Sequence, residues 1–234
     1  MSGNAKHGIL IDEPNDLVQG NRVGTDISGT VAVPNGTGGG GPWAGIAVRG
    51  PSTVVGGTLE GVSETTLGEA NLVSGNTALG ILVGPGSAFS EVHGNLVGAA
   101  NDGDAPLGNG SHGIVVVEQH VLVGLGSSNV VLDNGGDGIH VESGSGGEVA
   151  WVMILHNMIG EGLLAGVHGN GGDGISLVQG TSSLHDNDVR DNWVQSSGGV
   201  GIRVDGRSGD VRSTGRSPPA RARTHARVGP FGVR

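Results

Sequence analysis

The segment Asn134-Gly-Gly-Asp-Gly-Ile-His-Val141 recurs almost unchanged 36 residues later, as Asn170-Gly-Gly-Asp-Gly-Ile-Ser-Leu177. Its last four residues follow a pattern of glycine, aliphatic, any residue, aliphatic. This pattern occurs seven times in the 234 residues, beginning at Gly8, Gly45, Gly80, Gly113, Gly138, Gly174 and Gly201. Self-similarity at intervals of 25 to 37 residues is typical of a protein built by stacking one repeated unit.

Each copy of the pattern predicts a short β-strand. Side chains alternate between the two faces of a strand, so Ile139 and Val141 point to one side and His140 to the other. A strand of three or four residues is not stable alone, and it must pair with the strand of the next copy. Aliphatic pairs that end in Gly or Asn, such as Leu72-Val-Ser-Gly-Asn76, supply further strands and the turns between them, since both residue types tolerate left-handed backbone conformations.

Stacking these units predicts an all-β chain, a single right-handed parallel β-helix (solenoid) of about seven rungs over residues 1–206. The Ile, Val and Leu side chains that point inward would form one continuous core. Glycine interrupts almost every window, and no segment sustains a period of 3.6 residues, which argues against helices. A β-sandwich is the remaining alternative, but it requires longer strands and hairpin spacing.

Composition agrees with many tight turns joined by short strands. Glycine accounts for 50 of 234 residues, aromatic residues for 2% and cysteine for none. Glycine is not every third residue, which excludes collagen, and the absence of cysteine excludes disulfide scaffolds and thiolate metal sites. No run approaches the roughly 18 apolar residues of a membrane-spanning helix.

Charge divides the chain at Gly206. Residues 207–234 contain seven arginines and one acid, a net charge of +6, and are rich in Pro and Ala. This composition predicts a disordered tail, with a non-native continuation of the chain as the alternative. The overall net charge is −10, so residues 1–206 carry a net charge of −16. An acidic body argues against nucleic acid as a partner.

Two further stretches carry a family resemblance: Asn21-Arg-Val-Gly-Thr-Asp26 and Gly169-Asn-Gly-Gly-Asp-Gly-Ile175. From about Gly8 to Gly206 the chain resembles right-handed parallel β-helix proteins of the pectin-lyase-like fold, and among them the large bacterial surface proteins most closely. The resemblance implies a structural or adhesive module of a larger exported or cell-surface protein, extracellular, in contact with polysaccharide or cell-surface components. The N-terminus shows no signal peptide, and we expect a fragment with neighbouring domains in a longer chain.

The alternative that the resemblance implies is a carbohydrate-active enzyme (a polysaccharide lyase, hydrolase or epimerase) or a sugar-binding module. Outward strand positions in the last three copies place His140, Glu142, Arg203 and Asp205, with Ser176, on one surface. Together they supply an acid, a base and a cation. The catalytic motifs of the known enzymes of this fold are missing, so we favour a module without catalytic activity.

Calcium is the one cofactor that the sequence leaves open. Asp186, Asp188 and Asp191 lie close together on predicted turns and offer the hard oxygen ligands that Ca²⁺ prefers. Smaller pairs of Asp occur at 102/104 and 133/137. The nine His are scattered singly, so no zinc or copper site is predicted. The three tryptophans lie in or beside predicted strands and are expected to be packing residues or to fill the edges of the rungs: Trp43, Trp151 and Trp193.

Overall fold

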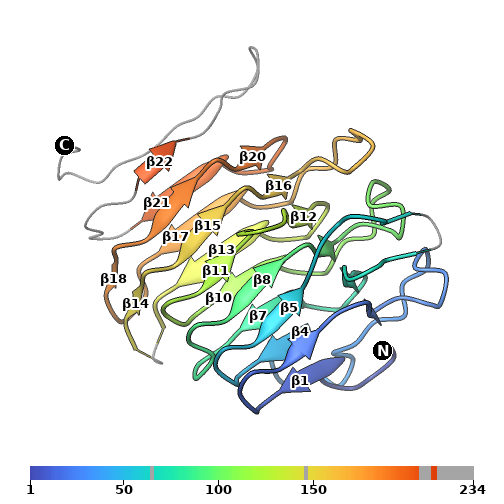
Figure 1. Ribbon diagram of the computed structural model, residues 1–234, viewed down its shortest axis with the longest axis horizontal. Helices are drawn as coiled ribbons and strands as arrows, with labels where there is room; N and C mark the ends of the chain where they lie inside the picture. Colours follow the sequence, from blue (N-terminus) through green and yellow to red (C-terminus); the bar gives the residue numbers. More distant parts are fainter. Residues whose placement is uncertain (64–65, 145–146, 206–211, 215–234) are drawn as a thin grey trace.

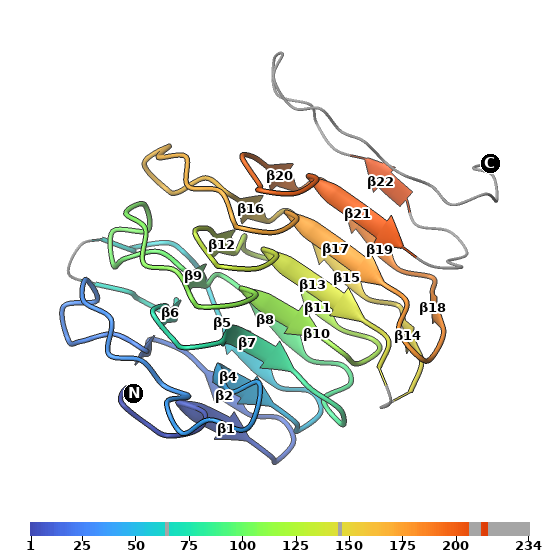
Figure 2. The same ribbon diagram turned by 180° about the vertical axis from the view of Figure 1, so that it is seen from behind.

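The computed structural model describes residues 1–63, 66–144, 147–205 and 212–214. Over these ranges the chain is an all-β parallel β-helix without helices, in which successive coils stack from the N-terminal end to the C-terminal end (Figures 1 and 2). The expected architecture is therefore confirmed. Within the same ranges no helix is long and apolar enough to cross a membrane.

Three parallel sheets run the length of the stack. The first sheet has seven strands, in agreement with the seven copies of the glycine pattern, and the other two have seven and six. The first contains β1 (Ile9–Ile11), β4 (Ala44–Val48), β7 (Leu79–Val83), β10 (Ile114–Val116), β13 (Ile139–Glu142), β17 (Ile175–Val178) and β21 (Ile202–Asp205). The second contains β2 (Leu17–Val18), β5 (Val54–Gly56), β8 (Glu91–His93), β11 (Leu122–Val123), β15 (Met153–Leu155), β19 (Asp188–Arg190) and β22 (Arg212–Thr214). The third contains β3 (Arg22–Val23), β6 (Leu72–Val73), β9 (Leu96–Val97), β12 (Val130–Val131), β16 (Met158–Ile159) and β20 (Trp193–Val194), while β14 (Val149–Ala150) and β18 (Leu184–His185) form a separate pair.

Equivalent residues of the repeat pair in register, which builds the core. Ile139 of β13 pairs with Ile114 on one side and with Ile175 on the other, and all three side chains are fully buried. The inward Ile, Val and Leu side chains of the three sheets form one continuous hydrophobic cluster. Because every coil covers the apolar surface of its neighbours, the very short strands are stable only as a stack.

In every copy except the last, which begins at Gly201, the opening glycine is required by a close approach between coils. A Cβ atom on Gly138 would lie 2.7 Å from the carbonyl oxygen of Gly174 and 2.8 Å from a methyl group of Ile159. Real Cβ atoms do not approach so closely, so any side chain here would push two coils apart. Packing, and not a left-handed backbone, selects glycine at this position.

Asparagine has a different role from the one predicted. Asn15 is the only Asn among the described non-glycine residues with a left-handed backbone, so the expectation that Asn side chains serve mainly to permit left-handed turns is wrong. Most of them form two buried ladders, in which the side-chain amide of one coil donates a hydrogen bond to the side-chain oxygen of the next. The first ladder is Asn71, Asn95, Asn129, Asn157 and Asn192; the second is Asn35, Asn76, Asn109, Asn134 and Asn170.

Of the segment 207–234, which was expected to be disordered, the structure describes only residues 212–214. These form β22, which pairs in parallel with β19 and extends the second sheet. The rest of the predicted tail, like the question whether it is a native continuation, lies outside the described residues.

Candidate functional site

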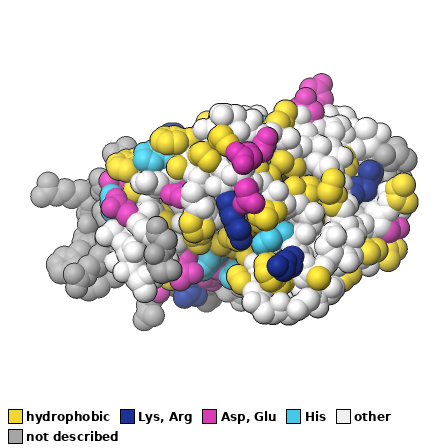
Figure 3. Space-filling model, turned by 90° about the horizontal axis from the view of Figure 1, so that it is seen from below, with side chains coloured by type: hydrophobic (Ala, Val, Ile, Leu, Met, Phe, Trp, Pro, Cys, Tyr) yellow, Lys and Arg dark blue, Asp and Glu magenta, His cyan; other side chains and the backbone are white. Residues whose placement is uncertain are grey.

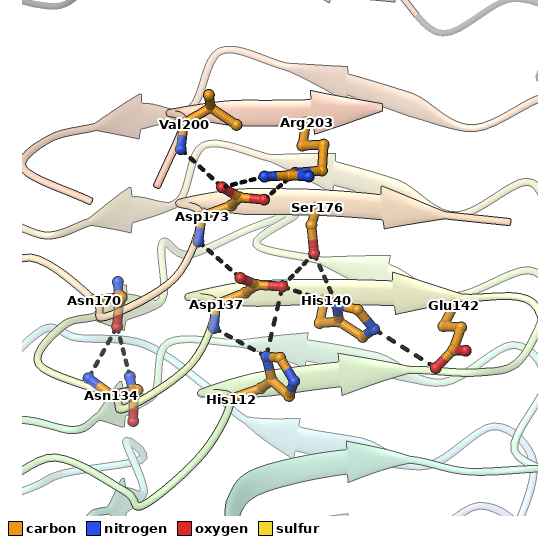
Figure 4. Close-up of polar contacts among 10 residues, drawn as sticks. All are labelled: His112, Asn134, Asp137, His140, Glu142, Asn170, Asp173, Ser176, Val200 and Arg203. Carbon is orange, nitrogen blue, oxygen red and sulfur yellow. Dashed lines mark hydrogen bonds and ion pairs between the residues drawn. The ribbon is translucent and has the colours of Figure 1, made fainter. Parts of the chain in front are cut away.

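The residue before each repeat glycine stacks on its counterpart in the next coil. His112, Asp137, Asp173 and Val200 occupy this position in four consecutive coils (Figure 4). Asp137 Oδ1 accepts the backbone N–H of Asp173, and Asp173 Oδ1 accepts that of Val200, both at 2.7 Å. The backbone N–H of Asp137 in turn donates to His112 Nδ1 at 2.9 Å. Side chains of this column therefore join each coil to the next.

A second column, formed by the outward side chains of the strands, lies against the first. His140 of β13 and Ser176 of β17 are paired in register. Asp137 Oδ2 accepts hydrogen bonds from His140 Nδ1 at 2.9 Å and from Ser176 Oγ at 2.6 Å. Asp137 thus lies at the centre of a polar cluster to which three coils contribute (Figure 4).

The arrangement of Ser176, His140 and Asp137 differs from a catalytic triad. In a triad the carboxylate binds one imidazole nitrogen and the hydroxyl binds the other. Here Ser176 Oγ lies 2.7 Å from His140 Nδ1, the same nitrogen that faces Asp137. Ser176 is also only 1% exposed. It is therefore placed to hold Asp137 and not to attack a substrate.

Three of the four predicted catalytic residues gather around this cluster. His140 Nε2 lies 3.7 Å from Glu142 Oε2, and Arg203 donates from Nε to Asp173 Oδ2, with Nη2 3.4 Å from Oδ1. Glu142 is exposed, whereas Asp173 is buried. The fourth, Asp205, lies at the exposed end of β21 and pairs in register with Val178. Val178 in turn pairs with Glu142, so it lies between the two carboxylates, which are two coils apart.

The electrostatics of the cluster favour an ionised carboxylate. Burial opposes ionisation of Asp137, but the hydrogen bonds from His140, Ser176 and the Asp173 backbone outweigh it and hold the pKa of this carboxyl far below its usual range. Burial, together with the neighbouring His140, lowers the pKa of His112, whose ring stacks on that of His140 with centroids 4.5 Å apart.

The predicted calcium ligands do not converge. Asp186 accepts a hydrogen bond from His185 Nδ1 at 2.8 Å, and Asp188 forms an ion pair with Arg190 at 3.0 Å. Asp191 is exposed on a turn with a left-handed backbone. Across the part of the chain that the structure describes, one group of three His, Asp or Glu residues has converging ligand atoms, and it is His112, Asp137 and His140.

A second surface feature is a column of aromatic rings at the turn before the second sheet. Phe89, His120 and Trp151 belong to consecutive coils, and their rings stack with centroids 4.8 and 4.6 Å apart. Phe89 is 62% exposed and Trp151 47%, so of the two places expected for Trp151 it occupies the edge of its coil and not the core. The rings line a shallow groove of about 400 Å³ with Glu91, Leu122 and Met153.

One face of the described part of the chain mixes side chains of different character. In the view of Figure 3, apolar side chains are interspersed with acidic, basic and histidine side chains, and no one type covers the face. The exposed aromatic column and the polar cluster around Asp137 are therefore the two features that a function can be argued from.

The sequence reasoning missed Asp173 as a member of the site and considered His112 and Asp137 only in other contexts. A detectable signal was present, because aligning the seven copies on their glycine places these residues in one column. The aromatic column carries no such signal, since Phe89, His120 and Trp151 belong to turns without a shared motif.

Comparison of the chain with protein-family models, with curated proteins and with solved structures finds no match in any of the three. The fold is therefore established from the chain's own strand pairing, and its function has to be argued from the two surface features described above.

Proposed function

We propose that this chain is a structural or adhesive β-helix module that contacts glycans through the column of Phe89, His120 and Trp151. The observation that carries the proposal is the exposure of stacked aromatic rings beside a groove, at turn positions where the fold does not require an aromatic residue. The placement in a larger exported or cell-surface protein, and the pectin-lyase-like affiliation, rest on the sequence resemblance alone.

The aromatic residues at these turns are unfavourable for folding. Phe89, His120 and Trp151 have φ values of 64°, 56° and 54°, a left-handed conformation that costs bulky residues on the order of 1–2 kcal/mol each. The equivalent turn positions of other coils carry the small or polar residues Ser52 and Asp186. Ring stacking returns about 0.5–1.5 kcal/mol per pair, while exposed Phe and Trp surface gains nothing from burial. A binding role explains why rings are present.

The groove has the chemistry of a sugar site. The free ring face of Phe89 and the apolar side chains of Leu122 and Met153 suit the C–H faces of a pyranose, and the carboxylate of Glu91 accepts hydrogen bonds from hydroxyl groups. With Glu91 at the groove and a body charge of −16, a polyuronate would be repelled. The glycan favoured by this surface is therefore neutral.

The test measures binding of neutral and acidic polysaccharides by tryptophan fluorescence and by affinity electrophoresis. Trp151→Asn and Phe89→Asn remove a ring but keep a residue that tolerates the left-handed backbone. Leu164→Ala is the matched control, because Leu164 is 72% exposed on a different surface loop. We expect both Asn variants to weaken binding of a neutral glycan at least tenfold and the control to leave it unchanged. Equal binding by all four proteins, or no binding by the wild-type chain, would refute the proposal.

A specific observation also favours the enzymatic alternative. His140 is oriented by Asp137 at Nδ1 and presents Nε2 to Glu142, which is how a general acid or base is held in many enzymes. Incubation with a panel of polysaccharides, with and without Ca²⁺, should then release new reducing or unsaturated ends, and Glu142→Gln and Arg203→Ala should abolish the release at unchanged circular dichroism. Persistent inactivity across the panel would eliminate this alternative.

A further inference from the structure

The polar cluster also has the composition of a metal site. His112, Asp137 and His140 each offer one ligand atom, and these three atoms lie within 4.8 Å of one another. Both rings turn Nδ1 toward the same carboxylate oxygen, Asp137 Oδ2, at 2.9 Å from His140 and 3.6 Å from His112. Two imidazoles and one carboxylate therefore converge on one point at the surface of the first sheet.

The separations suit a small ion with short bonds. Zn²⁺ binds imidazole nitrogen and carboxylate oxygen at about 2.0–2.2 Å, which places two tetrahedral ligands roughly 3.3 Å apart. The distances of 2.9 and 3.6 Å lie on either side of this value. Transition-metal ions and Zn²⁺ bind well to nitrogen ligands, whereas Ca²⁺ and Mg²⁺ prefer sites made wholly of oxygen ligands.

The groups behind the carboxylate are those that a metal ligand needs. Asp137 Oδ1 is fixed by the backbone N–H of Asp173 at 2.7 Å, and Ser176 Oγ holds Oδ2 from the next coil. Such outer-shell hydrogen bonds orient metal-binding carboxylates. The side chain of His112 is 29% exposed, which leaves a path for the ion and a coordination position for water.

From this geometry we propose that His112, Asp137 and His140 form a Zn²⁺ site, a function beyond the proposed glycan contact. The ion occupies the place of the proton between His140 Nδ1 and Asp137 Oδ2. As the N–Zn bond forms, the proton on His140 Nδ1 is replaced by one on Nε2, which lies beside Glu142. The ring therefore stays neutral and no net proton is released. The hydrogen bond from the Asp137 N–H to His112 Nδ1 is exchanged for the second N–Zn bond.

The experiment is calorimetric titration of the untagged full chain with ZnCl₂, in two buffers of different ionisation enthalpy so that released protons are counted. Asp137→Asn and His112→Gln each remove a ligand, and His156→Asn is the control, because His156 is exposed and outside the cluster. We expect one Zn²⁺ per chain, the same binding enthalpy in both buffers because no net proton is released, and no comparable binding of Ca²⁺. The affinity should fall more than about tenfold in each ligand variant, since even an outer-shell partner contributes that much, and should not change in the control.

Two results would overturn the proposal: no binding of Zn²⁺ by the wild-type chain, or the same affinity in Asp137→Asn, His112→Gln and the wild type. Circular dichroism shows whether each variant is folded. A wild-type measurement keeps the proposal testable if the ligand variants fail to fold. Co²⁺ in the site should give the intense visible absorption of a four-coordinate ion, and the weak spectrum of hexaaqua Co²⁺ at saturating metal would equally overturn it.

Discussion

The buried asparagine ladder predicts a large loss of stability from a single small substitution, Asn129→Ala. The Asn129 side chain is fully buried in the middle of the first ladder. Its Oδ1 accepts from the backbone and side-chain nitrogens of Asn95, at 3.1 and 3.0 Å. Its Nδ2 donates to Val92 O and to Asn157 Oδ1, both at 2.9 Å. Alanine abolishes all of these hydrogen bonds at once.

The magnitude follows from these bonds. Each contributes about 1 kcal/mol, and the N–H of Asn95 is left buried without an acceptor, so the free energy of unfolding should fall by about 4 kcal/mol. Asn21→Ala is the matched control, because Asn21 lies one coil before Asn71, the first member of the same ladder, and donates to it. Its side chain is half-buried and donates only to Gln19 O and Asn71 Oδ1, so the loss should be about 1–2 kcal/mol.

The assay is urea denaturation followed by circular dichroism, with the free energy of unfolding compared at a common slope. The ladder explanation requires Asn129→Ala to lose at least twice as much stability as Asn21→Ala. If Asn129→Ala cost less than about 1 kcal/mol, or no more than the control, the side-chain ladder would not be a source of stability, and the stack would depend on the apolar core alone.

Three other predictions address charge, backbone and core. In the presence of a chelator, the free energy of unfolding should fall between pH 7 and pH 5. The pKa of His112 is lower in the folded chain than in the unfolded chain, so unfolding takes up a proton. His112→Gln should flatten this part of the pH curve, and an identical curve for both proteins would refute the assignment. Gly124→Ala should prevent folding, since its Cβ would lie 2.0 Å from the carbonyl oxygen of Leu155, whereas Gly126→Ala, equally left-handed but in open space, should cost only about 1 kcal/mol in thermal unfolding. Ile139→Ala removes a fully buried side chain and should cost about 3 kcal/mol by denaturant titration; a loss below 1 kcal/mol would contradict the role assigned to this core column.

The sequence predicted where each strand of the first sheet lies. Its seven strands are the seven copies of the glycine pattern, and Ile139 and Val141 face the core as their alternation indicated. This succeeded because period-2 alternation and a fixed glycine determine both the register and the inward face of a strand. The function of Asn was misread because a left-handed turn and a side-chain ladder select the same residue, and only the stacking of coils distinguishes them.

The candidate site was predicted in part for a related reason. His140, Glu142 and Arg203 lie on strands, where alternation shows which side chains are outward. Asp137 and Asp173 lie in the turns before those strands, and turn side chains have no periodicity from which their direction can be read. Phe89 and Trp151 were beyond prediction, since the coil lengths between them vary and their apolar character suggested burial.

The position of the polar cluster follows from the way a stacked repeat protein satisfies buried polar groups. In the two coils before His112 the position before the repeat glycine is apolar, with Ala44 and Leu79 buried against neighbouring side chains, whereas the first coil has His7 there. A single carboxylate in such a column would lack partners and would cost several kcal/mol. The Asp137 carboxylate is tolerated because His140 of its own coil and the Ser176 hydroxyl and Asp173 N–H of the next coil donate hydrogen bonds to it. A site on this fold must therefore arise as a run of polar substitutions at one position of consecutive repeats, and the run from His112 to Asp173 is such a series.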